Sequence, residues 1–228
     1  HIERCAVLGS GRVGCGFQRR ACGMVRVAAE ITREGIFGKL RKAEMGFGCR
    51  GRILGGGTYA TDPKLAGGGI LAEVGVHNVD AVLFLCGATD ARVTGSRTVL
   101  DHGMDIHTEA TVEVTTGEMD RVEFSFVVSN LVNTSERIIL HFEHASVSFS
   151  IFGEPELSVS RHGSRAGFIL RDSSDLHPRT SDQIFYAFWS EFIGGIRKGR
   201  PSSASAEGAV LTTRIVEQVY AAAEKNNN

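Results

Sequence analysis

Hydrophobic and polar positions follow a two-residue period through the middle of this chain. After residue 87, apolar and polar residues alternate in short, β-branched runs separated by turn residues, a pattern typical of strands with one buried face. It predicts six or seven consecutive strands, at residues 92–100, 108–116, 119–129, 135–144, 146–152, 156–162 and 167–171. Short connections between consecutive strands favour an antiparallel sheet.

The ends of the chain follow a helical period instead. Apolar residues at helical spacing predict helices at residues 21–34, 67–87, 182–198 and 206–225, with one further strand at 39–49. This order predicts an α+β fold, a large mostly antiparallel β-sheet with helices packed on one face. The strand at 119–129 is partly apolar on both sides. We therefore expect a homodimer or homotetramer to cover the open sheet face.

The predicted helix at 67–87 contains three polar side chains in an otherwise apolar pattern. They are Glu73, His77 and Asp80, and their spacings of four and three residues place them on one helical face. Burying such groups costs free energy unless they pair or take part in chemistry. Three interpretations stay open: a site of catalysis, a core histidine satisfied by the two acids, or a metal site that uses all three as ligands. No fourth ligand follows at helical spacing, so the metal site is the weaker alternative.

A glycine pattern at residues 9–14 fits G-x-G-x-x-G. This motif cradles a pyrophosphate when it lies between a strand and a helix of a βαβ unit. Here Gly16 and Gly23 interrupt the helix that would have to follow, and no further βα units come after it. The alternative is a turn that leads into a strand at residues 12–17.

Composition restricts the possible partners and the compartment. Residues 1–52 carry a net charge of +7 and the remainder −8, but a pI near 6.8 and the lack of interleaved aromatic residues argue against nucleic acid. No apolar run approaches the ~18 residues of a membrane span, and no leader pattern is present at the start. Five cysteines without a C-x-x-C pair are typical of reduced thiols. We expect a cytoplasmic protein without nucleic-acid or membrane partners.

Residues 67–80, GGGILAEVGVHNVD, resemble the signature GGG-x-L-x-D-x-G-x-H-x-x-D of the Gfo/Idh/MocA oxidoreductases, the glucose–fructose oxidoreductase and inositol dehydrogenase family. Residues 16–20 resemble the family's strand that ends in an arginine, and residues 31–40 its entry into the C-terminal domain. The segment before the triple glycine and the two closing helices are also similar, so the resemblance covers residues 15–225 in the family's order.

The resemblance implies a division of the chain and a function. Residues 1–14 would be a remnant or linker from a missing N-terminal Rossmann domain, and residues 15–228 the C-terminal substrate-binding and oligomerisation domain. In this family the nucleotide loop lies far upstream, so the glycines at 9–14 would not bind a nucleotide. The family transfers hydride between a sugar-like or polyol substrate and NAD or NADP. A chain truncated in this way would be inactive alone and would bind neither cofactor by itself.

The resemblance also implies roles for four residues. His77 matches the catalytic base, and Glu73 takes the place of the family's aspartate, one methylene longer. Arg20 would line the substrate cleft, and Asp80 would contact the substrate or hold His77. Two alternatives remain beside the dehydrogenase: a non-enzymatic binding or oligomerisation module derived from one, and the metal site at Glu73, His77 and Asp80. Within the family, glycoside cleavage and bilin reduction also stay open.

Overall fold

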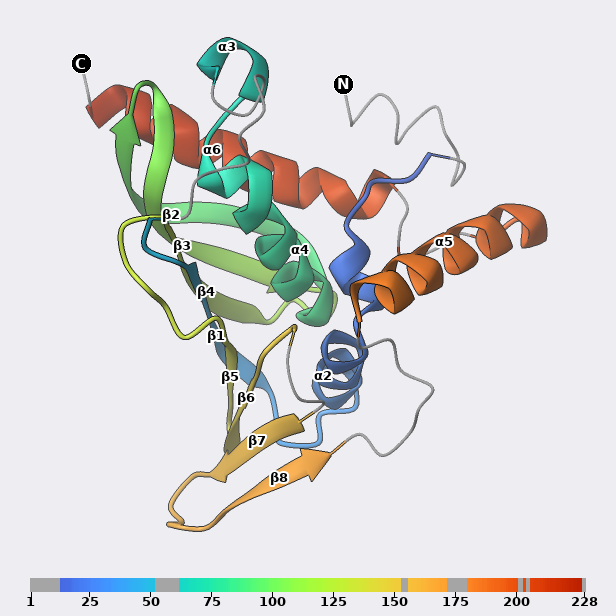
Figure 1. Cartoon of the computed structure of the whole chain (residues 1–228). Coiled ribbons are helices and arrows are strands. Elements are labelled where there is room, and N and C mark those ends of the chain that lie inside the picture. The colour runs from blue at the N-terminus through green and yellow to red at the C-terminus, as the bar shows by residue number, and fades with distance from the viewer. Residues whose placement is uncertain are drawn as a thin grey trace.

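The computed structural model describes residues 13–51, 62–152, 156–171, 180–200, 203 and 206–226. These residues form one eight-stranded sheet with helices on one side (Figure 1). The strands are β1 (Leu40–Gly48), β2 (Ala88–Asp101), β3 (Met104–Thr116), β4 (Arg121–Ser129), β5 (Ile138–Phe142), β6 (Ala145–Phe149), β7 (Glu156–Arg161) and β8 (Gly167–Arg171). The helices are η1 (Gln18–Ala21), α2 (Gly23–Arg33), α3 (Pro63–Ala66), η2 (Leu71–Gly75), α4 (Val76–Leu85), α5 (Ser181–Lys198), η3 (Ala206–Ala209) and α6 (Val210–Asn226). The predicted mostly antiparallel sheet and α+β class are confirmed.

The strand order departs from a simple meander at one place. The order is β2-β3-β4-β1-β5-β6-β7-β8, so the first strand of the chain lies in the middle of the sheet. β1 runs parallel to β4 and antiparallel to β5, whereas consecutive strands elsewhere pair antiparallel. A parallel neighbour requires a long crossover, and the segment from β1 through α4, β2 and β3 supplies it.

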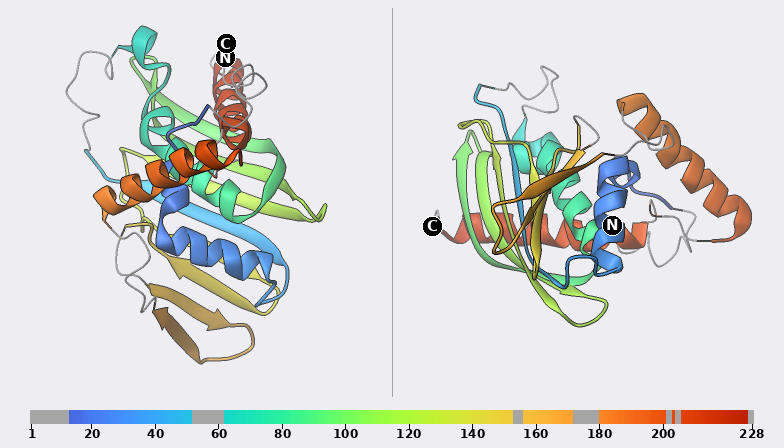
Figure 2. Two further views of the ribbon diagram at one scale, coloured as in Figure 1. Left: turned by 90° about the vertical axis from the view of Figure 1, so that its right-hand side faces the viewer. Right: turned by 90° about the horizontal axis from the view of Figure 1, so that it is seen from below.

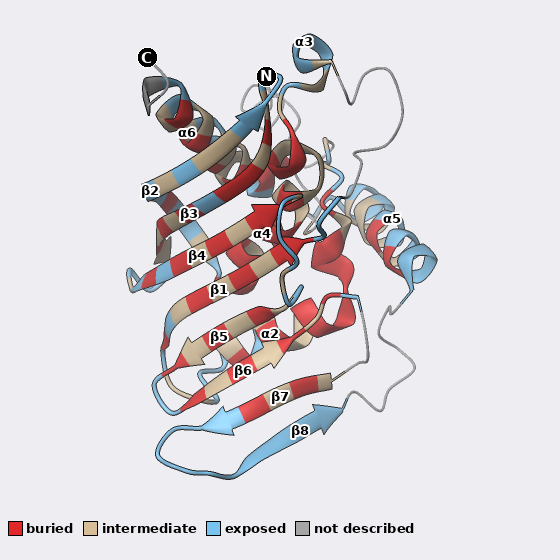
Figure 3. Ribbon diagram, turned by 60° about the vertical axis from the view of Figure 1, so that its left-hand side comes forward, coloured by how far each residue is buried: buried red, intermediate tan, exposed pale blue. Residues whose placement is uncertain are grey.

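One face of the sheet carries the core. Helices α2, α4 and α6 lie on this face, and no helix of the described residues covers the opposite face, which we call the bare face (Figure 2). Burial alternates along the central strands (Figure 3): in β4, Phe124 and Phe126 are buried beneath the helices, whereas Glu123 and Ser125 point the other way. The prediction that the strand at 119–129 is partly apolar on both sides holds at Val127, which lies on the bare face beside Ser125, while the rest of that face of β4 is polar.

The central helix is confirmed, although it does not start as an α-helix. Residues Leu71–Gly75 form a π-helical turn, and α4 continues from Val76 to Leu85. Gly75 allows this helix to approach the sheet, because a Cβ there would lie 2.8 Å from both methyl groups of Val128 in β4. π-turns widen a helix locally and are frequent at functional sites.

The same helix is long and apolar enough to cross a membrane by composition. The most apolar 18-residue window of the stretch Pro63–Leu85 has a mean hydropathy of 1.3, but 61% of that window is buried inside the fold. A helix buried against a sheet in this way is typical of a globular core.

The structure tests only part of what the sequence predicts for residues 9–20. Most of the glycine pattern at residues 9–14 lies outside the described residues. Residues 13–17 form no continuous strand, and Gln18–Ala21 form a 3₁₀ helix. The predicted strand at 12–17, and the likeness of residues 16–20 to a strand, were therefore wrong within the described part. In this 3₁₀ helix the side chains of Arg19 and Arg20 turn inward to α4.

Candidate functional site

His77 lies in the first turn of α4, directly after the π-turn that carries Glu73. The ring of Phe17 packs edge-on against the imidazole, with 5.7 Å between ring centroids and 83° between planes. His77 Nδ1 and Glu73 Oε2 are buried and have no hydrogen-bond partner within the described part of the chain. A third such atom, Oε1 of Gln18, lies in the neighbouring helix η1. Buried polar atoms are nearly always satisfied, so unpartnered atoms at His77 and Glu73 mark a place where a ligand can bind.

The environment of His77 keeps its imidazole neutral. Burial, together with the smaller effect of the positive charge of Arg19, lowers the pKa of His77 from 6.5 to about 4. Burial disfavours a charged imidazole because the surrounding protein solvates it less well than water does. A neutral imidazole near pH 7 has a free lone pair, as a general base requires.

Arg20 and Asp80 form a buried ion pair beneath this site. Arg20 Nε and Nη2 donate to the two carboxylate oxygens of Asp80 at 2.7 and 2.5 Å, and Asp80 is 0% exposed. Thr212 Oγ1 of α6 donates to the same carboxylate at 2.9 Å. Burial raises the pKa of the Asp80 carboxyl, and the hydrogen bonds from Arg20 and Thr212 oppose that effect.

The remaining donors of Arg20 also have partners. Nη1 donates to the carbonyl of Ser203 at 2.7 Å, and Nη2 to the carbonyl of Gly208 at 2.5 Å. Arg20 therefore connects η1 with α4 and with the chain between α5 and α6. These contacts favour a positioning role for Arg20 and Asp80. Their predicted contact with substrate stays a prediction.

Arg19 was not singled out from the sequence, yet it is almost as buried as Arg20. It donates to the side-chain oxygen of Asn78, and its guanidinium lies over the rings of Phe47 and Phe152 at 5.8 and 5.2 Å. Two adjacent arginines that precede an apolar helix were the signal available in the sequence. Only the fold shows that both point inward.

A second polar anchor holds the other end of the helix. Asp105 of β3 accepts hydrogen bonds from the backbone N–H groups of Gly69 at 2.6 Å and Leu71 at 2.9 Å, and from the hydroxyl of Tyr220 at 2.6 Å. A Cβ on Gly69 would lie 2.0 Å from the backbone oxygen of Asp105. The carboxylate thus satisfies N–H groups that a helix start leaves free, and it requires a glycine at position 69.

The three polar residues predicted on one face do not act as one cluster. Asp80 is turned to Arg20 and Thr212, whereas His77 contacts Phe17. Among the described residues no group of three His, Cys, Asp or Glu side chains is arranged to hold a metal ion. The alternative of a metal site at Glu73, His77 and Asp80 is therefore disfavoured, because the Asp80 carboxylate is occupied by Arg20.

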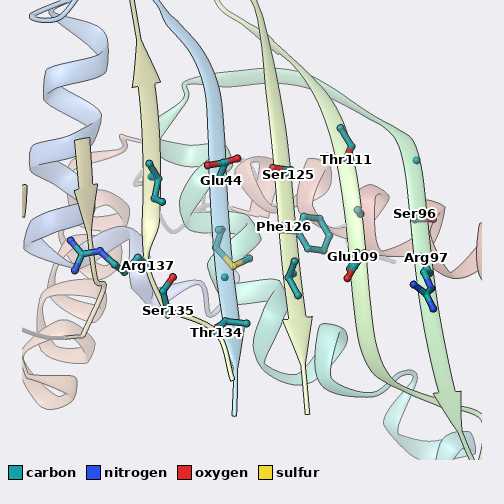
Figure 4. Close-up of a pocket in the computed structure, with 16 residues that line it drawn as sticks. Glu44, Ser96, Arg97, Glu109, Thr111, Ser125, Phe126, Thr134, Ser135 and Arg137 are labelled. Carbon is teal, nitrogen blue, oxygen red and sulfur yellow. The ribbon is translucent and has the colours of Figure 1, made fainter. Parts of the chain in front are cut away.

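The larger cavities lie elsewhere. One of about 560 Å³ opens on the bare sheet face between Glu44, Arg97, Glu109 and Arg137 (Figure 4). Another of about 700 Å³ lies beside the C-terminal ends of α2 and α4. Neither includes Glu73 or His77. The cavity of about 560 Å³ lies on the opposite side of the sheet from α4, so it does not belong to the candidate site at His77.

Removing the arginine of the buried ion pair should destabilise the fold strongly. Arg20→Ala leaves the Asp80 carboxylate buried without its charged partner, so we expect the free energy of unfolding to fall by about 3–5 kcal/mol. Urea denaturation measures it. Arg33→Ala, which breaks an exposed pair with Glu34, is the matched control and should change the free energy by less than about 0.5 kcal/mol. Equal effects of the two substitutions would contradict the anchoring role.

The depressed pKa of His77 predicts a loss of stability in mild acid. Between pH 6.5 and 4 the unfolded chain takes up a proton at this histidine and the folded chain does not, so unfolding becomes more favourable as the pH falls. From pH 7 to pH 5 the contribution is at most about 2 kcal/mol. In urea denaturation at both pH values, His77→Gln should show a smaller loss than the wild type. His102→Gln, at a side chain that is 90% exposed, should leave the loss unchanged. An unchanged loss in His77→Gln would refute the depressed pKa.

Comparisons with known proteins agree on the fold. The oxidoreductase domain protein from Kribbella flavida superposes with a TM-score of 0.78 at 15% identity, over 98% of this chain and 67% of that one. The aldose-aldose oxidoreductase from Caulobacter crescentus, complexed with glycerol, gives 0.74 at 16%, over 94% and 62%. The inositol dehydrogenase homolog from Azotobacter vinelandii, complexed with NAD⁺, gives 0.74 at 15%, over 93% and 63%.

The chain therefore spans about three fifths of the length of the Caulobacter protein, at 62%. No curated protein matches it. At these identities the structures establish the fold alone, but the sequence match is more specific. The family model of the GFO/IDH/MocA C-terminal domain matches residues 25–154, which is more than half of the chain and includes Glu73, His77 and Asp80. The chain belongs to the Gfo/Idh/MocA family, and it contains that family's C-terminal domain.

Proposed function

We propose that this chain is the substrate side of an NAD(P)-dependent oxidoreductase that acts on a sugar or polyol, with His77 as the base. The observation that carries the proposal is a pair of buried atoms, Nδ1 of His77 and Oε2 of Glu73, on adjoining turns of one helix, for which the described part of the chain offers no partner. An unpaired buried polar atom costs free energy. Hydroxyl groups of a polyol can supply the missing hydrogen bonds, because each hydroxyl both donates and accepts.

The structural neighbours support this substrate class. The Caulobacter protein is complexed with glycerol, and a levoglucosan dehydrogenase, which aligns with a TM-score of 0.69, is complexed with NADH and levoglucosan. These proteins are longer than this chain, which covers 62% and 63% of them. We infer that the nucleotide-binding part belongs to the length that this chain does not span. Residues 1–14 would then be its remnant or linker, and residues 15–228 the substrate domain.

The mechanism assigns a separate task to each polar group. A bound nicotinamide would supply the hydride acceptor for the carbon that bears the reacting hydroxyl. The neutral imidazole of His77 takes the proton of that hydroxyl. Glu73 accepts a hydrogen bond from the substrate and fixes the direction from which the hydroxyl reaches the imidazole. The extra methylene of Glu73, compared with the family's aspartate, would select a substrate whose hydroxyl lies farther from the helix.

Arg20 and Asp80 have a supporting role in this proposal. Their ion pair fixes the turn of α4 next to His77, so the imidazole keeps one orientation. The positive charge of Arg19 near His77 further opposes protonation. The alternative, a non-enzymatic module derived from a dehydrogenase, predicts no turnover even when the nucleotide-binding part is present. A cytoplasmic location stays a prediction.

The function test uses this chain and the polypeptide encoded by the complete reading frame. We expect no micromolar binding of NAD(H) or NADP(H) to the 228-residue chain by calorimetry. We expect NAD(P)-dependent turnover of polyols or sugars by the longer polypeptide. There, His77→Gln should lower kcat by about 10²–10⁴-fold and leave cofactor affinity unchanged, whereas His102→Gln should change neither. Equal turnover in His77→Gln refutes the base, and micromolar cofactor binding by the 228-residue chain refutes the missing domain.

We further propose that two copies associate through the bare face of the sheet as a dimer, or as a tetramer of such dimers. This face presents two acids and two bases around its cavity, namely Glu44, Glu109, Arg97 and Arg137 (Figure 4). In a two-fold interface the same patch meets itself, so the acids of one copy can meet the bases of the other. Because the face is largely polar, we expect charged and polar contacts in this interface and not a buried apolar layer.

Light scattering measures this association. Ser125→Arg places a bulky charge in the middle of the cavity wall, and we expect it to shift the chain toward the monomer. Ser164→Arg, at an exposed turn after β7, makes the same chemical change away from the face and should leave the oligomer intact. A wild-type monomer at high concentration would overturn the association.

A further inference from the structure

The last helix of the chain, α6, contacts both ends of the segment that contains the π-turn. It packs on α4, and Thr212 Oγ1 donates to Asp80 at 2.9 Å. Eight residues later, a rise of about 12 Å along an α-helix, the hydroxyl of Tyr220 donates to Asp105, which holds the start of the same segment. These contacts occur in opposite orders along α6 and along residues 69–80, so α6 lies antiparallel beside the π-turn.

Tyr220 fits closely against the glycines that precede the π-turn. A Cβ on Gly68 would lie 2.3 Å from the hydroxyl oxygen of Tyr220, and a Cβ on Gly69 would lie 2.0 Å from the backbone oxygen of Asp105. Neither position has room for a side chain, and glycine is the residue that permits such a close approach. The hydroxyl and the carboxylate therefore reach the backbone of this segment directly.

The hydroxyl of Tyr220 is both a donor and an acceptor. It donates to Oδ1 of Asp105 at 2.6 Å, and backbone hydrogen bonds from Ala72 and Gly69 reach its oxygen. Burial and the neighbouring charge of Asp105 raise the pKa of Tyr220, so the hydroxyl keeps its proton and remains a donor. One hydroxyl group thus joins α6 to β3 and to the first residues of the π-turn.

A continuous chain of hydrogen bonds leads from Tyr220 to the backbone of Glu73. The N–H of Gly69 donates to the same Oδ1 of Asp105 at 2.6 Å, and the carbonyl of Gly69 accepts from the N–H of Glu73 at 3.0 Å. Both backbone groups of Gly69 are therefore engaged, one by the pair of Asp105 and Tyr220 and the other by Glu73. The position of the backbone at Glu73, from which its carboxylate extends, follows from these bonds.

We propose that Tyr220 is a positioning residue for the reaction and acts on the carboxylate of Glu73 through Asp105 and Gly69. This inference rests on the proposed function, in which Glu73 fixes the direction of the reacting hydroxyl. A misplacement of about 1 Å can lower turnover by about 10²-fold, so the backbone that carries this carboxylate has to be held in one place. The competing explanation is that Tyr220 only stabilises the fold.

A conservative substitution separates the two explanations. Tyr220→Phe removes the hydroxyl and keeps the ring. In the polypeptide encoded by the complete reading frame, well below the unfolding midpoint, we expect kcat to fall by about 10–10²-fold and the affinity for NAD(P)H to stay unchanged. Thr213→Val is the matched control, because it removes an α6 hydroxyl that bonds to the carbonyl of Ala209, and it should change neither property. A lower unfolding midpoint with unchanged kcat in Tyr220→Phe would assign a structural role alone and refute the proposal.

A double-mutant cycle tests whether the effect passes through Glu73. In a Glu73→Ala background the carboxylate is absent, so Tyr220→Phe should lower kcat by less than about twofold. An effect of Tyr220→Phe as large as in the wild-type background would refute the proposed route. If Glu73→Ala itself turns over as fast as the wild type, the positioning role fails, while a large effect of His77→Gln would leave the base in place.

Amide hydrogen exchange tests the anchor without any turnover. In the 228-residue chain, Tyr220→Phe should accelerate exchange at the amide of Glu73 several-fold more than at the amide of Phe124 in β4, because local opening of the π-turn becomes easier. Equal changes at the two amides would overturn the proposal. If the longer polypeptide shows no NAD(P)-dependent turnover, the proposed function fails and the positioning role fails with it. If Tyr220→Phe turns over normally while His77→Gln is impaired, the positioning role alone is refuted.

Discussion

The buried ion pair between Arg20 and Asp80 is the interaction on which the rest of the site depends. It joins η1 to the middle of α4, and further bonds from the same two side chains reach Thr212, Ser203 and Gly208. Such a pair offsets its desolvation only when nearly every donor and acceptor is satisfied, as they are here. Its contribution is therefore positional, because it fixes α4 relative to η1 and to α6.

Asp105 acts at the opposite end of the same helix. Its carboxylate holds the backbone at Gly69 and Leu71, while Arg20 holds Asp80 about two turns beyond Glu73. The π-turn and His77 lie between these two anchors. A helix that is held on both sides of an irregular turn can carry that turn without moving, and Gly75 lets the turn rest directly against Val128 of the sheet. The position of His77 thus follows from contacts made by residues that need not touch a substrate.

The sequence predicts the helices and strands that depend on local patterns. It does not predict the strand order or the side-chain pairs that depend on residues far apart in the chain. The period of two located the strands from residue 88 onward, and the helical period located α2, α4, α5 and α6. The insertion of β1 between β4 and β5 depends on pairing with strands about 80 to 100 residues away, which no local pattern contains. The same holds for the partner of Asp80, since Arg20 lies 60 positions earlier. The spacing of Glu73, His77 and Asp80 singled out this part of the helix as a candidate site, but it could not show that Asp80 turns to Arg20.

The polar groups in and around this helix differ in how well they are satisfied, and the contrast bears on function. The carboxylates of Asp80 and Asp105 have several donors each, so the fold is able to satisfy buried charge where the charge is structural. Glu73 and His77 lie between them, and each retains a buried atom without a partner among the residues that the structure describes. If their role were only to stabilise the core, an apolar side chain would do so at lower cost. Exceptions to the rule that buried polar atoms have hydrogen-bond partners are typically found at functional sites. Of the two groups, the neutral imidazole of His77 is the one suited to accept a proton.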